Sequence, residues 1–152
     1  MADQATDKKY KAHTFNTSLE WTGDRNWIAR VSTCDEISCS PPKVFRGEEG
    51  NWTPEDLMLA SVTGCLLSTF VGYAERKHLE VVSYEAVADG ILEHDGTNYR
   101  FTKITVKPKI GVKSEADIET AKQYAHRAHD LCFMAYSVKA DVIIEPEVFV
   151  AE

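Results

Sequence analysis

The chain has 152 residues, 43% of them hydrophobic, which is enough for one compact domain over residues 1–152 and too little for two of ordinary size. Seventeen Lys and Arg residues against 24 Asp and Glu residues give a net charge of -7, which disfavours binding to nucleic acid and to anionic lipid. The N-terminus is polar and no run of 18 apolar residues occurs, so we expect a soluble, cytoplasmic protein without membrane contact, with residues 1–9 as a flexible tail.

The N-terminal part of the chain is predicted to form strands. Apolar alternation over residues 9–31 is interrupted by turn-forming residues at 22–26, a pattern typical of a hairpin. A third strand is predicted over residues 37–45. It should lie at a sheet edge or break, because Pro41 and Pro42 lack the N–H that a ladder requires.

A long helix is predicted to begin at Thr53 and to continue to about Leu79. Thr53 supplies a capping hydroxyl, Pro54 suits the first helical position, and Glu55 and Asp56 favour the positive end of the helix dipole. Apolar residues occupy most of the circumference, which indicates burial on nearly every side. A chain this small can hardly surround such a helix alone, so the pattern favours an intertwined dimer.

The remaining elements complete an α+β layout. Residues 80–92 and 99–112 alternate around a turn and predict a second hairpin. A second helix, capped by Ser114, should end near Leu131, and a final strand is predicted over residues 138–150. The predicted order is therefore strands, long helix, hairpin, helix and strand.

The chain has four cysteines, too few for a disulfide scaffold, and no C-x-x-C pair. Cys34 and Cys39 match no standard zinc spacing, and we interpret both as incidental. Cys65 lies in the long helix beside Gly64, a residue that costs up to about 1 kcal/mol in a helix interior and therefore indicates a close approach beside the thiol. Cys132 lies where the second helix ends, so the two thiols can meet if both helices pack on one sheet.

Two less reactive interpretations of these residues remain. A lone helical cysteine is most often a buried structural residue, which is the competing reading of Cys65. His126, His129 and Cys132 are spaced three residues apart and resemble a metal site. Steps of three drift around a helix and no fourth ligand is evident, so we predict no bound metal.

The sequence resembles the OsmC/Ohr family, named for osmotically inducible protein C and organic hydroperoxide resistance protein. The segment TPEDLMLASVTGC, residues 53–65, is similar to the family signature, in which a Thr/Asn-Pro-Glu start precedes a cysteine ten residues after the glutamate. Residues 132–138 look like the region of the second cysteine, and residues 22–25 resemble an early Thr-Gly-x-Arg turn. The resemblance covers nearly the whole chain after Tyr10.

The resemblance implies an intertwined homodimer in which curved sheets surround two central helices. It also implies thiol-dependent reduction of organic hydroperoxides, without a bound cofactor and with an external thiol or dithiol as reductant. Cys65 would be the attacking thiol and Cys132 the resolving thiol, with Arg25 and Glu55 as the polar pair beside them.

Physical arguments bear on whether Arg25 and Glu55 can act on Cys65. A peroxidase needs a thiolate, and burial disfavours one, so a nearby cation must compensate. Arg25 is the candidate, with Arg30 and Arg46 as weaker substitutes. Glu55 lies ten residues from Cys65, or about 15 Å along a helix, which exceeds the reach of its side chain. Glu55 therefore holds an arginine from a distance or serves the site of the other subunit.

One position departs from the family pattern. The hydroperoxide-resistance branch usually has proline immediately after the second cysteine, where this chain has Phe133. The alternative prediction is therefore an OsmC-like dimer without peroxidase activity that binds a small apolar ligand.

Overall fold

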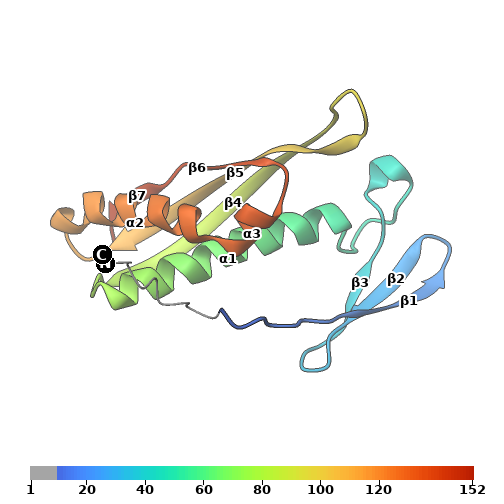
Figure 1. Ribbon diagram of the computed structural model, residues 1–152, viewed down its shortest axis with the longest axis horizontal. Coiled ribbons are helices and arrows are strands. Elements are labelled where there is room, and N and C mark those ends of the chain that lie inside the picture. Colours follow the sequence, from blue (N-terminus) through green and yellow to red (C-terminus); the bar gives the residue numbers. More distant parts are fainter. Residues whose placement is uncertain (1–9) are drawn as a thin grey trace, which may run out of the picture. The chain divides into compact units, whose positions relative to one another are not determined.

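The computed structural model describes residues 10–152; the predicted flexible tail, residues 1–9, lies outside the described residues. The contacts between residues divide the chain into two compact units, the first ending at Pro54 and the second running from Glu55 to Glu152 (Figure 1). Each unit is described separately below.

The first unit is built on a three-stranded antiparallel sheet. Its strands follow in chain order: β1 Ser18–Gly23, β2 Asn26–Arg30 and β3 Ile37–Cys39. The predicted hairpin is present, and its turn places Gly23 at φ 117° and Asp24 at φ 46°, a left-handed conformation that glycine and aspartate tolerate.

The third strand is shorter than predicted. The prediction extended it to Phe45, but β3 ends at Cys39, and a 3₁₀ turn occupies Lys43–Phe45. Pro41 and Pro42 separate the two elements, because neither can donate a ladder hydrogen bond.

The second unit packs helices on a four-stranded sheet. Its elements are α1 Pro54–Arg76, β4 Val81–His94, β5 Tyr99–Val112, α2 Ile118–Leu131, α3 Phe133–Ser137, β6 Asp141–Ile144 and β7 Glu147–Val150. β4 and β5 form the predicted long hairpin, and the chain returns after α2 to add β6 and β7 parallel to β5.

Two boundaries differ from the sequence prediction. The single final strand is in fact two strands, because Pro146 interrupts the ladder between β6 and β7. Ser114 does not cap the second helix directly: its hydroxyl donates to the Asp117 carboxylate at 2.8 Å, and a 3₁₀ turn over Glu115–Asp117 precedes α2.

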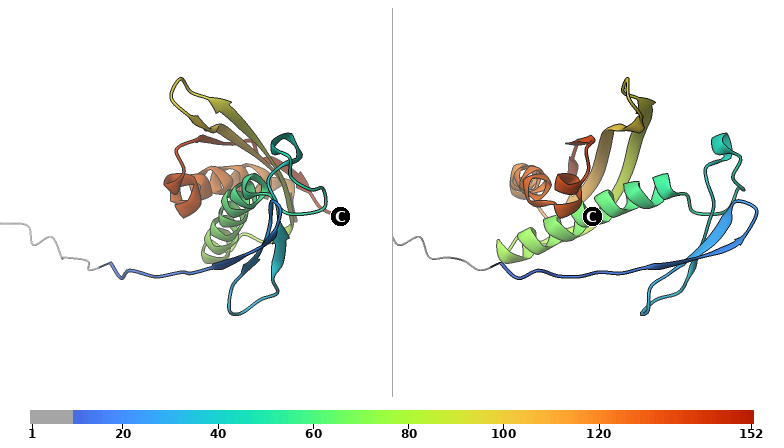
Figure 2. Two further views of the ribbon diagram at one scale, coloured as in Figure 1. Left: turned by 90° about the vertical axis from the view of Figure 1, so that its right-hand side faces the viewer. Right: turned by 45° about the vertical axis from the view of Figure 1, so that its right-hand side comes forward.

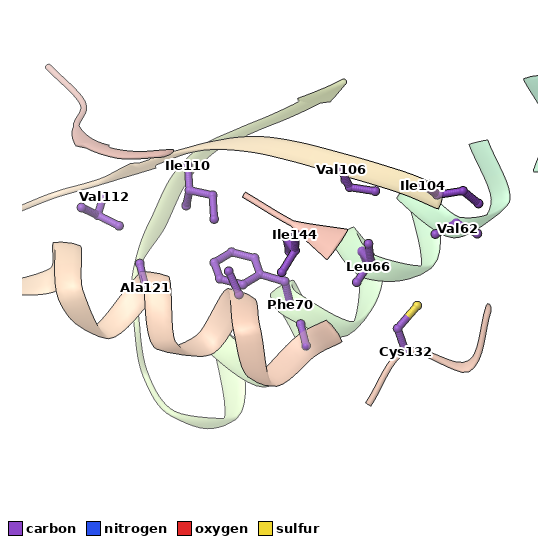
Figure 3. Packing of buried hydrophobic residues seen from close by; sticks show 12 residues of the cluster. Val62, Leu66, Phe70, Ile104, Val106, Ile110, Val112, Ala121, Cys132 and Ile144 are labelled. Atoms are coloured by element: carbon purple, nitrogen blue, oxygen red, sulfur yellow. The ribbon is translucent and has the colours of Figure 1, made fainter. Parts of the chain in front are cut away.

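The core of the second unit lies between its sheet and its helices, and α1 and α2 cover the same face of the sheet (Figure 2). Phe70 of α1 packs against Tyr84 of β4 with ring centroids 5.6 Å apart, and Tyr73 of α1 meets Tyr124 of α2 edge to face at 5.0 Å. Figure 3 shows the side chains of this buried cluster packed together, with Cys132 at one end.

Within one chain, α1 is buried on one side rather than on nearly every side, so the sequence expectation does not hold for a single protomer. The buried residues recur every fourth position: Val62, Leu66, Phe70 and Ala74. A neighbouring row that includes Ala60, Gly64 and Leu67 is exposed. Only about one side of a helix can face a single sheet, whatever the composition of its other sides.

The length and hydropathy of α1 also meet the criterion for a membrane-crossing helix, as do the core helices of many soluble proteins. In this chain its buried row packs into the cluster shared with β5 and α2.

Candidate active site

The structure brings Cys65 and Cys132 together. Cys65 lies midway along α1 and is half-buried, whereas Cys132 lies between α2 and α3 and is 1% exposed. Both are free thiols, and their sulfur atoms are within hydrogen-bonding distance of each other. In Figure 3 the sulfur of Cys132 points toward the buried row of α1.

The short helix α3 supplies polar contacts to both sulfur atoms. Cys132 is its N-cap, and the Cys132 Sγ accepts a hydrogen bond from the Ala135 amide at 3.4 Å. The backbone amides of Met134 and Phe133 donate toward the sulfur of Cys65. The thiol pair therefore lies against backbone N–H groups that α3 itself leaves without an intrahelical partner.

These contacts lower the pKa of Cys65. Burial, the largest single influence, raises it, but the Met134 amide and the Cys132 thiol together oppose burial. The Thr69 hydroxyl and the Phe133 amide add to the lowering, and the resulting pKa of Cys65 is below its ordinary value. The Thr69 hydroxyl also lies 2.8 Å from the Cys65 carbonyl oxygen, and its single proton can serve only one acceptor at a time.

The pKa of Cys132 moves the other way. Burial raises it most, and the hydrogen bond to Cys65 together with the charge of a Cys65 thiolate raises it further, although the amides of Ala135 and Met134 act in the opposite direction. Cys65 is thus the thiol that ionises first. Burial, with a smaller contribution from the charge of Cys132, also raises the pKa of Tyr84 to about 12.

Gly64 does not mark a close approach within this chain, contrary to the sequence interpretation. It is exposed, and apart from its chain neighbours and the backbone of its own helix, no atom of the described residues lies within 4 Å of a Cβ added there. The absence of a side chain therefore leaves open space beside the helix rather than relieving a contact inside the protomer.

The predicted arginine lies in the other unit. Arg25 is exposed in the β1–β2 turn, and its guanidinium donates to the Phe45 carbonyl at 3.4 Å. Of the two substitutes, Arg30 is engaged with Glu20 and Glu36 at 2.7 Å each, and Arg46 ends the 3₁₀ turn at φ 66°. Among the described residues, the lowered pKa of Cys65 arises from backbone amides, a thiol and a hydroxyl, and the assignment of Arg25 to the site stays a prediction.

Glu55 occupies the first turn of α1, as predicted. Its position ten residues before Cys65 on the same helix corresponds to about 15 Å of axial rise. One carboxylate oxygen, Oε2, is buried and has no hydrogen-bond partner among the described residues. Burying an acceptor without a donor costs free energy of folding, so we expect Glu55 Oε2 to require a hydrogen-bond donor.

The remaining sulfur and imidazole groups do not assemble further. Cys34 is exposed, and Cys39 is buried in β3, where its Sγ lies 3.7 Å from the Ile37 carbonyl. In the part of the chain that the structure describes, no three His, Cys, Asp or Glu side chains gather into a group that could hold a metal ion. His129 instead bonds the Val142 carbonyl at 2.7 Å.

Large apolar side chains are exposed close to the thiol pair in sequence and in space. On α3, Phe133 is 78% exposed and Tyr136 is 91% exposed, and Met134 is also partly open to solvent. Beside α3, a cavity of about 300 Å³ is lined by residues that include His129, Ala135, Tyr136 and Asp141.

The sequence did not identify all the groups that act on the Cys65 sulfur. Thr69 lies four residues after Cys65, a spacing that places both on one side of a helix and that could have revealed it. No sequence pattern could have revealed the amides of Phe133 and Met134, because every residue except proline has the same backbone N–H.

The fold is α+β, and it brings two of the four thiols of the chain together, one half-buried on a core helix and one at a helix N-cap. Residues 47–147 match the family described as OsmC-like protein, and the chain belongs to that family.

Among known proteins, the chain is 24% identical over 139 residues to the uncharacterized protein YmaD of Bacillus subtilis, covering 89% of this chain and 93% of YmaD. Among solved structures, an OsmC-like protein of unknown function from Vibrio cholerae superposes with a TM-score of 0.83 at 23% identity, covering 90% of this chain and all of the other. An organic hydroperoxide resistance protein from Elizabethkingia anophelis superposes with a TM-score of 0.74 at 16% identity, covering 94% of this chain and all of the other. These structural likenesses establish the OsmC fold.

Proposed function

We propose that the protein is a thiol-dependent peroxidase that reduces organic hydroperoxides to alcohols. The observation that carries the proposal is the contact between Cys65 and Cys132, in which the pKa of Cys65 is lowered and that of Cys132 is raised. Such a pair has a nucleophile that ionises readily and a second thiol that stays protonated beside it. Membership in the OsmC-like family agrees with this chemistry.

In the first step the Cys65 thiolate attacks one oxygen of the peroxide. An S–O bond forms, the O–O bond breaks, and the leaving alkoxide takes a proton to become the alcohol. Cys65 is oxidised by two electrons to a sulfenic acid, and the peroxide is reduced by the same two electrons.

In the second step the Cys132 sulfur attacks the Cys65 sulfur. A disulfide forms, the S–O bond breaks, and hydroxide leaves with the Cys132 proton as water. An external thiol or dithiol then reduces the disulfide by exchange, and the cycle needs no bound cofactor. Exposed Phe133 and Tyr136 beside the pair favour an organic hydroperoxide over hydrogen peroxide.

The proposal includes a homodimer with Arg25 and Glu55 as the polar pair of the site. The exposed row Ala60, Gly64 and Leu67 supports the dimer, because the open space beside Gly64 lets a second chain approach α1 closely and the exposed Leu67 offers it an apolar contact. The unpartnered Glu55 oxygen supports a guanidinium donor, for which Arg25 is the candidate. In this arrangement Arg25 orients Glu55 or the peroxide, while the backbone amides stabilise the thiolate.

The proposal also places the protein in the cytoplasm, with a small hydroperoxide and a dithiol as its partners. The net charge of -7 disfavours binding to nucleic acid and to anionic membranes.

The test is steady-state reduction of cumene hydroperoxide with a dithiol by wild type, Cys65→Ser and Cys132→Ser. Cys65→Ser should lower turnover by about three orders of magnitude or more, as expected for loss of a nucleophile. Cys132→Ser should accumulate a Cys65 sulfenic acid that dimedone traps. Lack of turnover by wild type, or full turnover by Cys65→Ser, would contradict the proposal.

A second candidate is an OsmC-like dimer that binds a small apolar ligand without peroxidase activity. It is favoured by Phe133, which follows Cys132 where the hydroperoxide-resistance branch usually has proline and which is 78% exposed. Retention of an apolar fluorescent probe by a wild-type protein that shows no turnover would support this candidate instead.

A further inference from the structure

His129 lies in the last turn of α2, three residues before Cys132. Its side chain is 32% exposed, and its Nε2 lies 2.7 Å from the carbonyl oxygen of Val142 in β6. Because a carbonyl oxygen only accepts, the ring must donate from Nε2. This bond fixes the end of α2 to the sheet.

The backbone of the same residue holds Cys132. The Cys132 amide donates to the His129 carbonyl at 3.2 Å, and this bond closes α2 as the chain turns into extended conformation at Cys132, with φ -74° and ψ 115°. Cys132 then starts α3, since its own carbonyl accepts from the Tyr136 amide at 3.0 Å. His129 is therefore bonded both to the sheet and to the residue that carries the second thiol.

The other end of this connection is rigid. Val142 pairs with Ile104 of β5 in the parallel ladder, and Ile104 is fully buried in the cluster that also contains Cys132. A continuous series of contacts thus runs from the central strand through Val142 and His129 to Cys132.

Placement is demanding for a disulfide, since it requires Cα atoms within about 7 Å and a narrow range of side-chain directions. Cys65 is fixed within a 23-residue helix, whereas Cys132 lies in the extended break between two helices. The break is the place where Cys132 can lose alignment, and small misplacements of reacting groups lower rates strongly.

We infer that His129 is a positioning residue, whose Nε2–H bond to the Val142 carbonyl holds the Cys132 sulfur against Cys65 and so promotes closure of the disulfide. The inference rests on the proposed Cys65–Cys132 couple. It assigns His129 no contact with the peroxide.

The bond does not depend on a charged ring. The Nδ1 atom lies 3.7 Å from the Asp130 carboxylate, and Nε2 carries a proton in both the imidazolium and the Nε2–H neutral form. A neutral amide at the same place should replace the ring. The glutamine Nε2 is separated from Cα by as many bonds as the histidine Nε2, and the asparagine amide is one bond shorter.

The test measures the effective concentration of Cys132 toward Cys65. Full-length wild type, His129→Ala, His129→Gln and His129→Asn are equilibrated in glutathione redox buffers, quenched, alkylated, and analysed by peptide mass spectrometry for the Cys65–Cys132 disulfide. His129→Ala and His129→Asn should lower the effective concentration about fivefold to tenfold, the factor for one hydrogen bond, and His129→Gln should restore it to within about twofold.

His126→Ala is the matched control, because His126 lies on the same helix and is exposed, and it should leave the effective concentration unchanged. An unchanged value in His129→Ala, or equal values in His129→Gln and His129→Asn, would overturn the inference. If His129→Ala fails to fold, the comparison of glutamine with asparagine still decides.

The measurement is separate from the test of peroxidase activity. Hydroperoxide turnover with equal effective concentrations in all variants would contradict the positioning role alone. If the His129 variants change the effective concentration as expected but the wild type does not turn over hydroperoxide, the peroxidase proposal alone is contradicted.

Discussion

The thiol of Cys65, on the first helix of the second unit, lies within hydrogen-bonding distance of the thiol of Cys132, at the N-cap of α3. The two thiols shift each other's pKa in opposite directions. A proton shared between the two sulfur atoms stabilises the thiolate of one and disfavours ionisation of the other. The predictions below follow from this contact and from the packing around it.

The difference in pKa between Cys65 and Cys132 should be measurable by alkylation. In the reduced protein, the pH profile for iodoacetamide modification of Cys65 should have its midpoint below that of an ordinary cysteine, and the profile for Cys132 should lie above it. Thr69→Val should raise the Cys65 midpoint by removing one donor, and Thr69→Ser, which keeps the hydroxyl, should restore it. Peptide mass spectrometry separates the two sites. Equal midpoints for the two cysteines would contradict this account.

The hairpin tip between β4 and β5 should show a strongly acidic aspartate. The Asn98 and Thr97 amides and the Arg100 guanidinium lower the pKa of Asp95 from 3.8 to about 2. Because the folded pKa is the lower one, the stabilisation is complete above pH 3.8 and is lost as the pH falls through about 2. Carboxyl ¹³C NMR titration measures the midpoint, and Asp95→Asn should weaken the acid dependence of stability. A midpoint at or above 3.8 would contradict the prediction.

Leu66→Ala should destabilise the fold by about 2–5 kcal/mol, because Leu66 is fully buried and its truncation leaves a cavity. Urea unfolding at fixed protein concentration measures the change. Val87→Ala is the control: Val87 is 63% exposed, and its truncation should change stability by less than about 0.5 kcal/mol. A loss for Leu66→Ala no larger than the control would show that α1 does not pack as described.

Leu67→Glu should separate the proposed homodimer into monomers, since it places a charge on the exposed row of α1. Sedimentation velocity at micromolar concentration should give two chains for wild type and one for the variant. Gln123→Glu adds the same charge to an exposed position of α2 and should remain dimeric. A monomeric wild type would refute the dimer.

Local patterns anticipated most of the elements. The Thr53-Pro54-Glu55 start predicted α1, which begins at Pro54, and alternation predicted the long hairpin that β4 and β5 form. Prolines accounted for two of the boundaries that were wrong, at Pro42 and Pro146, because proline has no N–H to donate to a ladder.

The sequence by itself determined the α+β order and the capped apolar helix that carries Cys65, because caps, turns and periodicity act over a few neighbouring residues. Only the tertiary structure decided that Cys132 lies against Cys65, that backbone amides of α3 act on the pKa of Cys65, and that His129 bonds the Val142 carbonyl of β6. These contacts join residues distant in sequence or use main-chain atoms common to every residue, so no local pattern encodes them.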